Sequence, residues 1–207
     1  MIPDRDHWER EYSKPDPVWK GPPADLPLLE GGRVLELGCG GGKTAAGLVK
    51  VAGEVVGIDH SRKGLHACTR SASSPRLELV EGDVRCLPFS GRSFDHVVAY
   101  HVLGHLLEDD RRRAIAEIDR VLRPGGSIHV RTFSARDMRA GEGEEVEPGT
   151  FLRGNGIRTH YFTDEEMVSL FPSRVAARLD EVVVRKRYHG RDMLRAEWNA
   201  TYEATGP

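Results

Sequence analysis

The stretch VLELGCGGGKT, residues 34–44, constrains the fold of this chain more than any other segment. A short apolar run leads into it, and helix-forming residues follow from Lys43 to the glycine at position 53. A strand that runs through glycines into a helix builds the ligand crevice at the carboxyl edge of an open α/β sheet. Glycines let a ligand approach the main chain closely, and the helix directs its free N–H groups at that ligand. The stretch therefore predicts a binding site close to the start of the chain.

The alternation of strands and helices continues as far as Phe133. The last helix of this series has Ile115, Ile118 and Leu122 on one face and acidic residues in its first turn, as an amphipathic helix requires. Such alternation predicts a mostly parallel sheet with right-handed crossovers in a doubly wound order. We expect strands over 33–37, 54–59, 76–83, 93–100 and 127–133, and helices over 43–53, 62–72 and 108–122.

The pattern changes after the fifth expected strand. Residues 134–158 are rich in glycine and charge, and they predict a long loop; because so long a loop is unusual, we expect 134–160 to cover a substrate. Thr163 and Glu166 form a capping box that predicts a helix over 163–171. The last two segments, 178–188 and 191–203, alternate and predict an antiparallel hairpin. We thus expect one α/β domain over 1–207, with seven strands and helices on both faces.

Composition excludes some classes of protein and favours others. With 39% hydrophobic and 30% charged residues, the chain has the balance of a soluble globular domain. Its net charge of −2 gives no overall attraction to nucleic acid or to acidic membranes. No apolar run approaches the roughly 18 residues of a membrane span, and the polar N-terminus lacks the apolar core of a signal peptide. We therefore expect a cytoplasmic protein whose three cysteines are reduced thiols.

The N-terminal segment, residues 1–30, has a composition of its own. Five prolines between residues 13 and 31 predict an extended stretch, and DHWEREY just before it places Trp8 and Tyr12 on one side of a short amphipathic turn. We expect this segment either to fold over the site as a lid or to pack on the edge of the core.

Spacing separates the cofactors that use a glycine-rich crevice. The dinucleotide pattern GxGxxG, counted from Gly38, fails because Lys43 stands in place of its third glycine. The P-loop pattern fails because the Gly-Lys-Thr sequence comes one residue too early. The pattern that fits is acid-x-G-x-G-x-G on Glu36, Gly38, Gly40 and Gly42. It resembles the first motif of the class I S-adenosylmethionine-dependent methyltransferases, which implies a Rossmann-like fold.

Four further landmarks are similar to that family and stand in the same order. VVGIDHS ends the second expected strand with Asp59, and EGDVRCLPF ends the third with Asp83. FDHVVAYHVLGHL resembles the fourth strand with its exit loop, and LRPGG resembles the turn before the fifth. The resemblance covers residues 30–133, and the tail HYFTDEEMVSLF is similar to small-molecule enzymes of the ubiquinone-biosynthesis or tellurite-resistance kind.

The resemblance implies roles for individual residues around S-adenosylmethionine. Asp59 would accept hydrogen bonds from the ribose, Asp83 would reach the adenine amino group, and Glu36 would lie near the amino group of the methionine moiety. Each has a plain structural alternative: a helix cap for Asp59, a loop hydrogen bond for Asp83, and a partner of the glycine amides for Glu36. The full expected donor site is Glu36, Gly38, Cys39, Gly40, Gly42, Asp59, His60, Asp83, Val84 and Tyr100.

The acceptor side is less specific. His101 follows the fourth strand, beside the donor in this family, and we expect it to act as a general base or to contact the donor. His101 and His105 have the spacing of metal ligands, but no third ligand is evident and we expect no metal. Arginines at 131, 136, 153 and 158 are candidates to clamp a carboxylate or phosphate. The expected substrate contacts are Tyr12, His105, His160 and Tyr161.

The implied reaction is an in-line methyl transfer to a small-molecule acceptor, with S-adenosylhomocysteine as the product. Because the donor is already activated, the protein mainly has to hold two reactants aligned. Two alternatives stay open. One is a methyltransferase for RNA or protein, which would present a basic face beside the donor; the other is a non-catalytic protein that binds the same nucleoside. The oligomeric state is not predicted.

Overall fold

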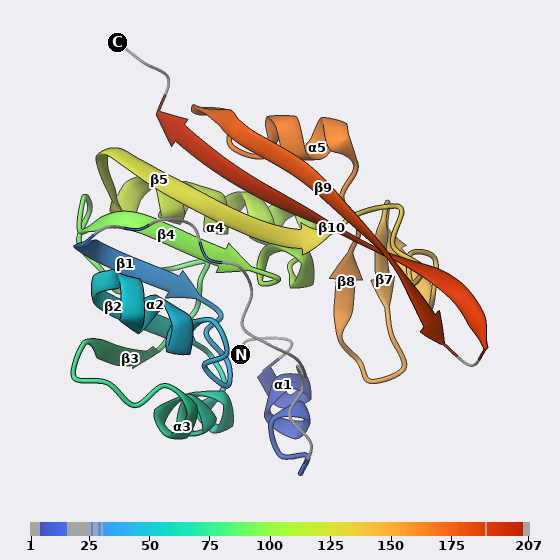
Figure 1. The fold of residues 1–207 in the computed structure, drawn as a ribbon, viewed down its shortest axis with the longest axis horizontal. Coiled ribbons are helices and arrows are strands. Elements are labelled where there is room, and N and C mark those ends of the chain that lie inside the picture. Colours follow the sequence, from blue (N-terminus) through green and yellow to red (C-terminus); the bar gives the residue numbers. More distant parts are fainter. Residues whose placement is uncertain (1–4, 16–25, 27–28, 30, 189, 205–207) are drawn as a thin grey trace.

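A seven-stranded sheet forms the centre of the computed structural model, which describes residues 5–15, 26, 29, 31–188 and 190–204 (Figure 1). Its strand order is β3-β2-β1-β4-β5-β10-β9. β1 pairs in parallel with both β2 and β4, so the strand order reverses beside β1, where an open α/β sheet forms its crevice. The strands are β1 Gly31–Leu37, β2 Ala52–Asp59, β3 Leu77–Glu81, β4 Phe94–Tyr100, β5 Leu122–Phe133, β9 Arg174–Tyr188 and β10 Arg191–Ala204.

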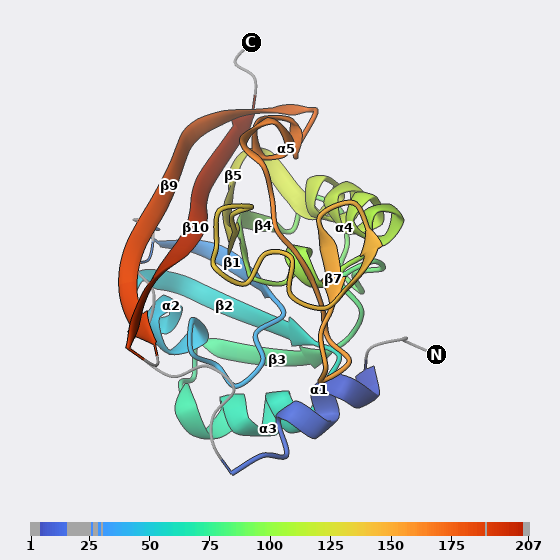
Figure 2. The ribbon, with the colours of Figure 1, turned by 90° about the vertical axis from the view of Figure 1, so that its right-hand side faces the viewer.

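Helices cover both faces of the sheet, as predicted (Figures 1 and 2). Leu48 of α2 packs with Val34 of β1 on one face, whereas Ile118 of α4 and Met167 of α5 belong to the larger core on the opposite face. Among the described residues, no helix is long and apolar enough to span a membrane. The helices are α1 Arg5–Glu11, α2 Ala45–Val51, α3 Arg62–Ser71, α4 Glu108–Val121 and α5 Asp164–Ser169, with the short 3-10 helix η1 Leu103–His105.

Local capping explains why two helices begin where the sequence predicts. The Ser61 hydroxyl accepts a hydrogen bond from the Gly64 N–H and starts α3. The capping box of Thr163 and Glu166 is complete, with both reciprocal hydrogen bonds present at the start of α5. The predicted antiparallel hairpin is confirmed as β9 and β10, which pair from one end to the other.

Two expectations for the connecting segments need correction. Residues 134–158 are not one structureless loop, because they hold most of a three-stranded antiparallel sheet: β6 Glu144–Glu147, β7 Thr150–Leu152 and β8 Arg158–His160. Strands of three or four residues are too short to show an alternating pattern. β5 also begins five residues earlier than expected, at Leu122 directly after α4. Most of the proline-rich stretch 13–31 lies outside the described residues.

A chain of polar side chains is enclosed on one side of the central strands. The His96 ring bonds to the Ser127 hydroxyl at 2.8 Å, and that hydroxyl lies 2.8 Å from Nε2 of His129. The other ring nitrogen of His129 lies 3.2 Å from the Thr201 hydroxyl of β10. Burial, helped by the charge of His96, lowers the pKa of His129 to about 4. His129 is therefore neutral in the folded protein at pH 7.

The low pKa of His129 predicts that the free energy of unfolding falls as the pH is lowered. Below pH 6.5 the unfolded chain protonates His129 while the folded protein resists until about pH 4, so stability is lost as the pH falls through that window. We expect wild type to lose about 2 kcal/mol more than His129→Asn between pH 7 and pH 5, at about 1.4 kcal/mol per unit of pKa shift. Urea unfolding at both pH values measures this. The exposed His66→Asn is the control, and equal losses in wild type and His129→Asn would contradict the assignment.

Candidate active site

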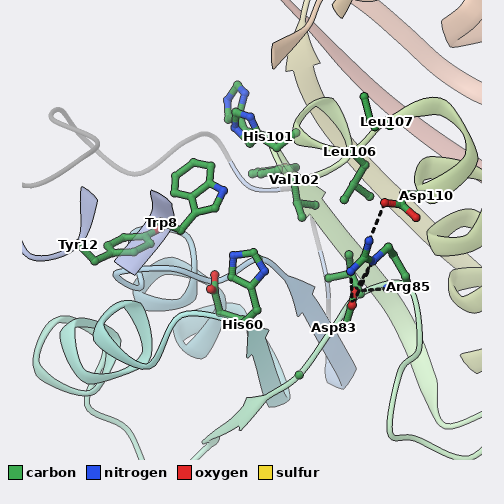
Figure 3. Close-up of a pocket in the computed structure, with 16 residues that line it drawn as sticks. Trp8, Tyr12, His60, Asp83, Arg85, His101, Val102, Leu106, Leu107 and Asp110 are labelled. Atoms are coloured by element: carbon green, nitrogen blue, oxygen red, sulfur yellow. Dashed lines mark hydrogen bonds and ion pairs between the residues drawn. The ribbon is translucent and has the colours of Figure 1, made fainter. Parts of the chain in front are cut away.

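A cavity lies at the carboxyl edge of the sheet, bounded by the ends of β1, β2 and β4 and roofed by α1 (Figure 3). Its volume is about 810 Å³ including the open mouth. This is the edge at which the sequence placed the crevice, because parallel strands bring their carboxyl ends together. Nine of the expected site residues line it: Tyr12, Gly38, Asp59, His60, Asp83, Val84, Tyr100, His101 and His105.

The glycine turn reaches the cavity at Gly38, and its conformation requires glycine at three positions. Gly38, Gly40 and Gly42 have φ angles of 65°, 47° and 81°, a region that side chains rarely adopt. A Cβ on Gly38 would lie 2.9 Å from the Val102 side chain, and one on Gly40 would overlap the Tyr12 hydroxyl. The turn therefore needs glycine both for its conformation and for the close approach of neighbouring groups.

Two buried carboxyl groups support this turn. Asp59 at the end of β2 accepts hydrogen bonds from the N–H groups of Gly40 and Ser61, both at 2.8 Å. Burial raises the pKa of Asp59, although those two N–H groups act in the opposite direction. Burial also raises the pKa of Glu36 well above its usual value, and no described residue forms a hydrogen bond with its buried Oε2 atom. A buried carboxyl oxygen without a protein partner is suited to a ligand amino group or an ordered water.

An ion-pair network fixes the third acidic position. Arg85 donates to both carboxylate oxygens of Asp83, at 2.7 to 3.0 Å, and reaches Asp110 of α4 at 2.6 Å (Figure 3). Burial opposes ionisation of Asp83, but the hydrogen bonds and charge of Arg85 outweigh it and hold the pKa below its usual value. Asp83 is thus a charged acceptor whose orientation is set by Arg85 and, through it, by α4.

His101 stands at the exit of β4 in a constrained backbone conformation. Its φ is 61°, unusual for a residue with a side chain, and its N–H donates to the Arg131 carbonyl at 2.7 Å. Burial, followed by the charges of His105 and three nearby arginines, lowers the pKa of His101 to about 3. Glu197 lies 3.9 Å from Nε2, too far for a hydrogen bond, and its charge does not offset the burial. The imidazole is therefore neutral at pH 7.

Helix α1 closes the cavity from above. Trp8 and Tyr12 stack with their ring centroids 6.0 Å apart, and the Trp8 ring meets His105 edge to face at 4.9 Å. Arg5 at the start of the helix pairs with Glu81 at the end of β3. Tyr12 is half-buried, and desolvation together with the nearby acidic groups raises its pKa well above the usual value. Trp8 and Tyr12 thus line the cavity, and Tyr12 also packs on the glycine turn, whereas the role of this segment as a lid stays a prediction.

Other expected site residues do not line the cavity, and their roles stay predictions. Gly42 packs on α3 against Cys68. Cys39 belongs to the same buried cluster as Cys68. His160 is 2% exposed and is bonded to Thr150 and Glu166, which makes it a structural residue in this conformation. The remaining three are Glu36, Gly40 and Tyr161. Gly40 donates its N–H to Asp59 and lies against Tyr12, and Tyr161 packs against Phe133. Glu36 is buried near the end of β1.

Several residues of the cavity wall were not predicted. Arg85 and Asp110 come from a loop and from a helix distant in sequence, and Val102 fills the space left by Gly38. Leu106 and Leu107 complete the apolar side. The sequence signal for Arg85 was its position two residues after Asp83, which permits the bidentate pair observed here.

None of the four arginines considered as a clamp is among the residues that line the cavity. Arg136 pairs with Glu181, Arg153 with Glu142, and Arg131 with Asn199 on β10. Within the part of the chain that the structure describes, no three histidine, cysteine or acidic side chains are grouped so as to hold a metal ion.

Comparison with known proteins agrees with this geometry. Residues 35–130 match the family model described as a methyltransferase domain. The chain is similar to human tRNA N(3)-cytidine methyltransferase METTL2B, with 27% identity over 74% of this chain and 44% of that protein. It is also similar to phthiotriol/phenolphthiotriol dimycocerosates methyltransferase 1 of Mycobacterium ulcerans, with 41% identity over 48% of this chain and 37% of that protein. The chain thus spans less than half of either relative.

Solved structures show the same fold. A SAM-dependent methyltransferase from Methanosarcina mazei superposes with a TM-score of 0.72 and 24% identity, over 87% of this chain and 99% of that one. The predicted Rossmann-like sheet with its antiparallel hairpin is confirmed by this agreement.

The packing of Tyr12 on the turn generates a test with a built-in control. Gly40→Ala places a methyl group at positive φ and against the Tyr12 hydroxyl, so we expect it to release α1 and to cost at least about 1–2 kcal/mol. Gly41→Ala meets nothing closer than 3.7 Å and should be tolerated. Denaturant unfolding and limited proteolysis within α1 measure both effects. Equal behaviour of the two variants would show that Tyr12 does not depend on the bare backbone of Gly40.

Proposed function

We propose that this chain is a class I S-adenosylmethionine-dependent methyltransferase and that it methylates a small-molecule acceptor bound beneath α1, a reading that the matching methyltransferase-domain model and the shared fold support. The observation that carries the proposal is the aromatic cover of the cavity. Trp8, Tyr12 and His105 line it together with the acids Asp59 and Asp83. Val102, Leu106 and Leu107 add apolar surface, which suits a small acceptor.

The glycine turn and the acids near it fit the donor. Asp59 and Asp83 stand at the ends of adjacent strands as carboxyl acceptors, which suits ribose hydroxyls and an adenine amino group. The Glu36 oxygen that lacks a partner among the described residues suits the ammonium of the methionine moiety. Gly38 lines the cavity with main chain alone, which a nucleoside can contact directly. S-adenosylmethionine, when bound, supplies a methyl carbon on a positively charged sulfur, already activated for transfer.

The protein's own contribution is alignment and exclusion of water. Trp8 and Tyr12 cover the reactants, and this kind of positioning is worth about 7–11 kcal/mol when both are held in reactive geometry. His101 is neutral and fixed through its backbone, so it is suited to accept a hydrogen bond from an acceptor O–H or N–H group. Its low pKa makes it a weak proton acceptor, which favours an orienting role and leaves proton loss to solvent.

A methyltransferase for RNA is the second candidate, because the METTL2B relative matches 74% of this chain. It requires access for a nucleotide past α1 and a basic surface beside the cavity. The balanced charge of the chain and the seating of Trp8 on His105 favour the small acceptor. Assays of S-adenosylhomocysteine release with a panel of phenols, thiols, amines and carboxylates, alongside unmodified tRNA, distinguish the two; turnover with tRNA alone would overturn the proposal.

Donor binding should depend on Asp59. We expect Asp59→Ala to weaken binding of S-adenosylhomocysteine by more than about tenfold, because a buried charged hydrogen bond is worth about 1.5–3 kcal/mol. Isothermal titration measures the affinity. Asp95→Ala, at the opposite edge of the sheet, is the control. Because Asp59 also holds the N–H of Gly40, near-UV circular dichroism checks that the turn is intact. Unchanged affinity would remove Asp59 from the site.

The neutral state of His101 makes a prediction about pH. With a pKa of about 3, the His101 imidazole does not titrate between pH 5 and 8. With a small acceptor that the protein methylates, the pH–rate profiles of wild type and His101→Asn should therefore have the same shape over this range. The variant should lower kcat/KM by about 10- to 100-fold, the value of one buried hydrogen bond. Steady-state rates across this pH range test both statements, and an acid limb present only in wild type would show that His101 acts as a base.

A further inference from the structure

β9 is a long strand at the edge of the central sheet. It pairs with β10 on one side, and no described strand follows it in the sheet. Figure 2 shows it as the outermost strand on the left of the molecule. Fifteen residues long, it contains neither proline nor glycine, and its pairing with β10 is regular from Arg178 to Tyr188. Long, regular edges of this kind are templates for pairing with another chain.

The hydrogen-bond pattern shows which main-chain groups of β9 face outward. Ala196 of β10 directs its carbonyl to the Ser134 N–H and its own N–H to Asp137, so its polar groups point away from β9. Val183 is the residue opposite Ala196. Because opposed residues of an antiparallel pair share the same orientation and alternate along the strand, the N–H and C=O of Val183 also point outward. The same holds two residues away on each side, at Glu181 and Arg185.

We infer that a second copy of this chain docks here, by antiparallel pairing of β9 with β9 about a two-fold axis at Val183. The segment DEVVVRK, residues 180–186, is self-complementary in this register. Glu181 faces Arg185 of the other copy, and Asp180 faces Lys186. Val182 faces Val184, and Val183 faces itself. The contact closes on itself, as a two-fold interface does, and joins the two sheets into one.

The exposed side chains fit such an interface. Val182, Val183 and Val184 are 43%, 42% and 45% exposed, a continuous apolar run at the centre of the edge. Leu194 on β10 is 43% exposed and pairs with Arg185, so it adds apolar surface on the face that carries Val183. Cross-strand apolar and opposite-charge pairs each stabilise a sheet, and the register places both kinds on each face.

Charge decides between the possible registers. A two-fold axis at Glu181 or at Arg185 would oppose like charges, which destabilises pairing. An axis between two residues would set outward-facing main chain against groups that already bond to β10. In the part of the chain described here, Glu181 and Asp180 have cationic neighbours in Arg136 and Arg178, whereas Arg185 and Lys186 have no acidic partner. The second copy supplies that partner, and only the Val183 register does so for both residues.

Sedimentation velocity of the full chain over a range of concentrations tests the inference. Wild type should reach twice the mass of one chain as concentration rises. Val183→Lys opposes two lysines at the axis and should raise the dissociation constant by at least about tenfold. The matched control is Val175→Lys, on the same strand and 48% exposed but beyond the β9–β9 overlap, which should dimerise like wild type. Circular dichroism confirms that each variant is folded.

A charge exchange tests the register itself. Asp180→Lys and Lys186→Asp each place like charges opposite one another and should weaken the dimer, whereas the two together restore opposite pairs and should restore it. In a Cys86→Ser background, Val183→Cys should form a disulfide-linked dimer on mild oxidation, and Val175→Cys should not. A wild type that stays monomeric throughout, a dimer indifferent to Val183→Lys, or a double exchange that fails to recover would each overturn the inference.

Discussion

The bare backbone between β1 and α2 is the constraint on which the rest of the site depends. Three glycines at positive φ let the chain reverse within a few residues, and the space left by their missing side chains is taken up from both sides. Val102, at the exit of β4, fills the space beside Gly38, and Tyr12, directly after α1, fills the space beside Gly40. Asp59 then fixes the turn through the Gly40 N–H. One local conformation thus brings together three segments that are distant in sequence.

The same contacts link the packing of α1 to the glycine turn. α1 is only seven residues long, too short to be stable as an isolated helix, so its order comes from its contacts. Those contacts are the same groups that would meet the ligands: Gly40 beneath Tyr12, and His105 beside Trp8. A nucleoside that displaces Tyr12 from the turn would therefore loosen the roof, whereas one that fits beneath the Trp8 ring would strengthen it.

The sequence predicts what is local and periodic, and it fails where distant segments meet. The order of strands and helices, the Ser61 cap and the capping box at Thr163 all follow from short-range patterns, and the structure confirms them. The small sheet of β6–β8 was missed because strands of three or four residues are too short to show a clear alternating pattern. The Arg85–Asp110 contact was missed because no local signal joins a loop to the start of α4. Burial, together with the charges of His105 and three arginines, lowers the pKa of His101 to about 3, and the sequence shows neither cause.

The order of strands connects His101 with the outer edge of β9. The main chain of β5 holds His101 through the Arg131 carbonyl, and the Arg131 side chain is held by Asn199 of β10. β10 in turn is paired along its whole length with β9, whose outer edge is self-complementary. Pairing at that edge would leave the glycine turn untouched, since β1 and β2 lie beyond β4 and β5 in the sheet. It would instead restrain β5 and β10, which position His101, so in the function proposed above a second copy would act on the His101 side of the cavity and leave the glycine turn unchanged.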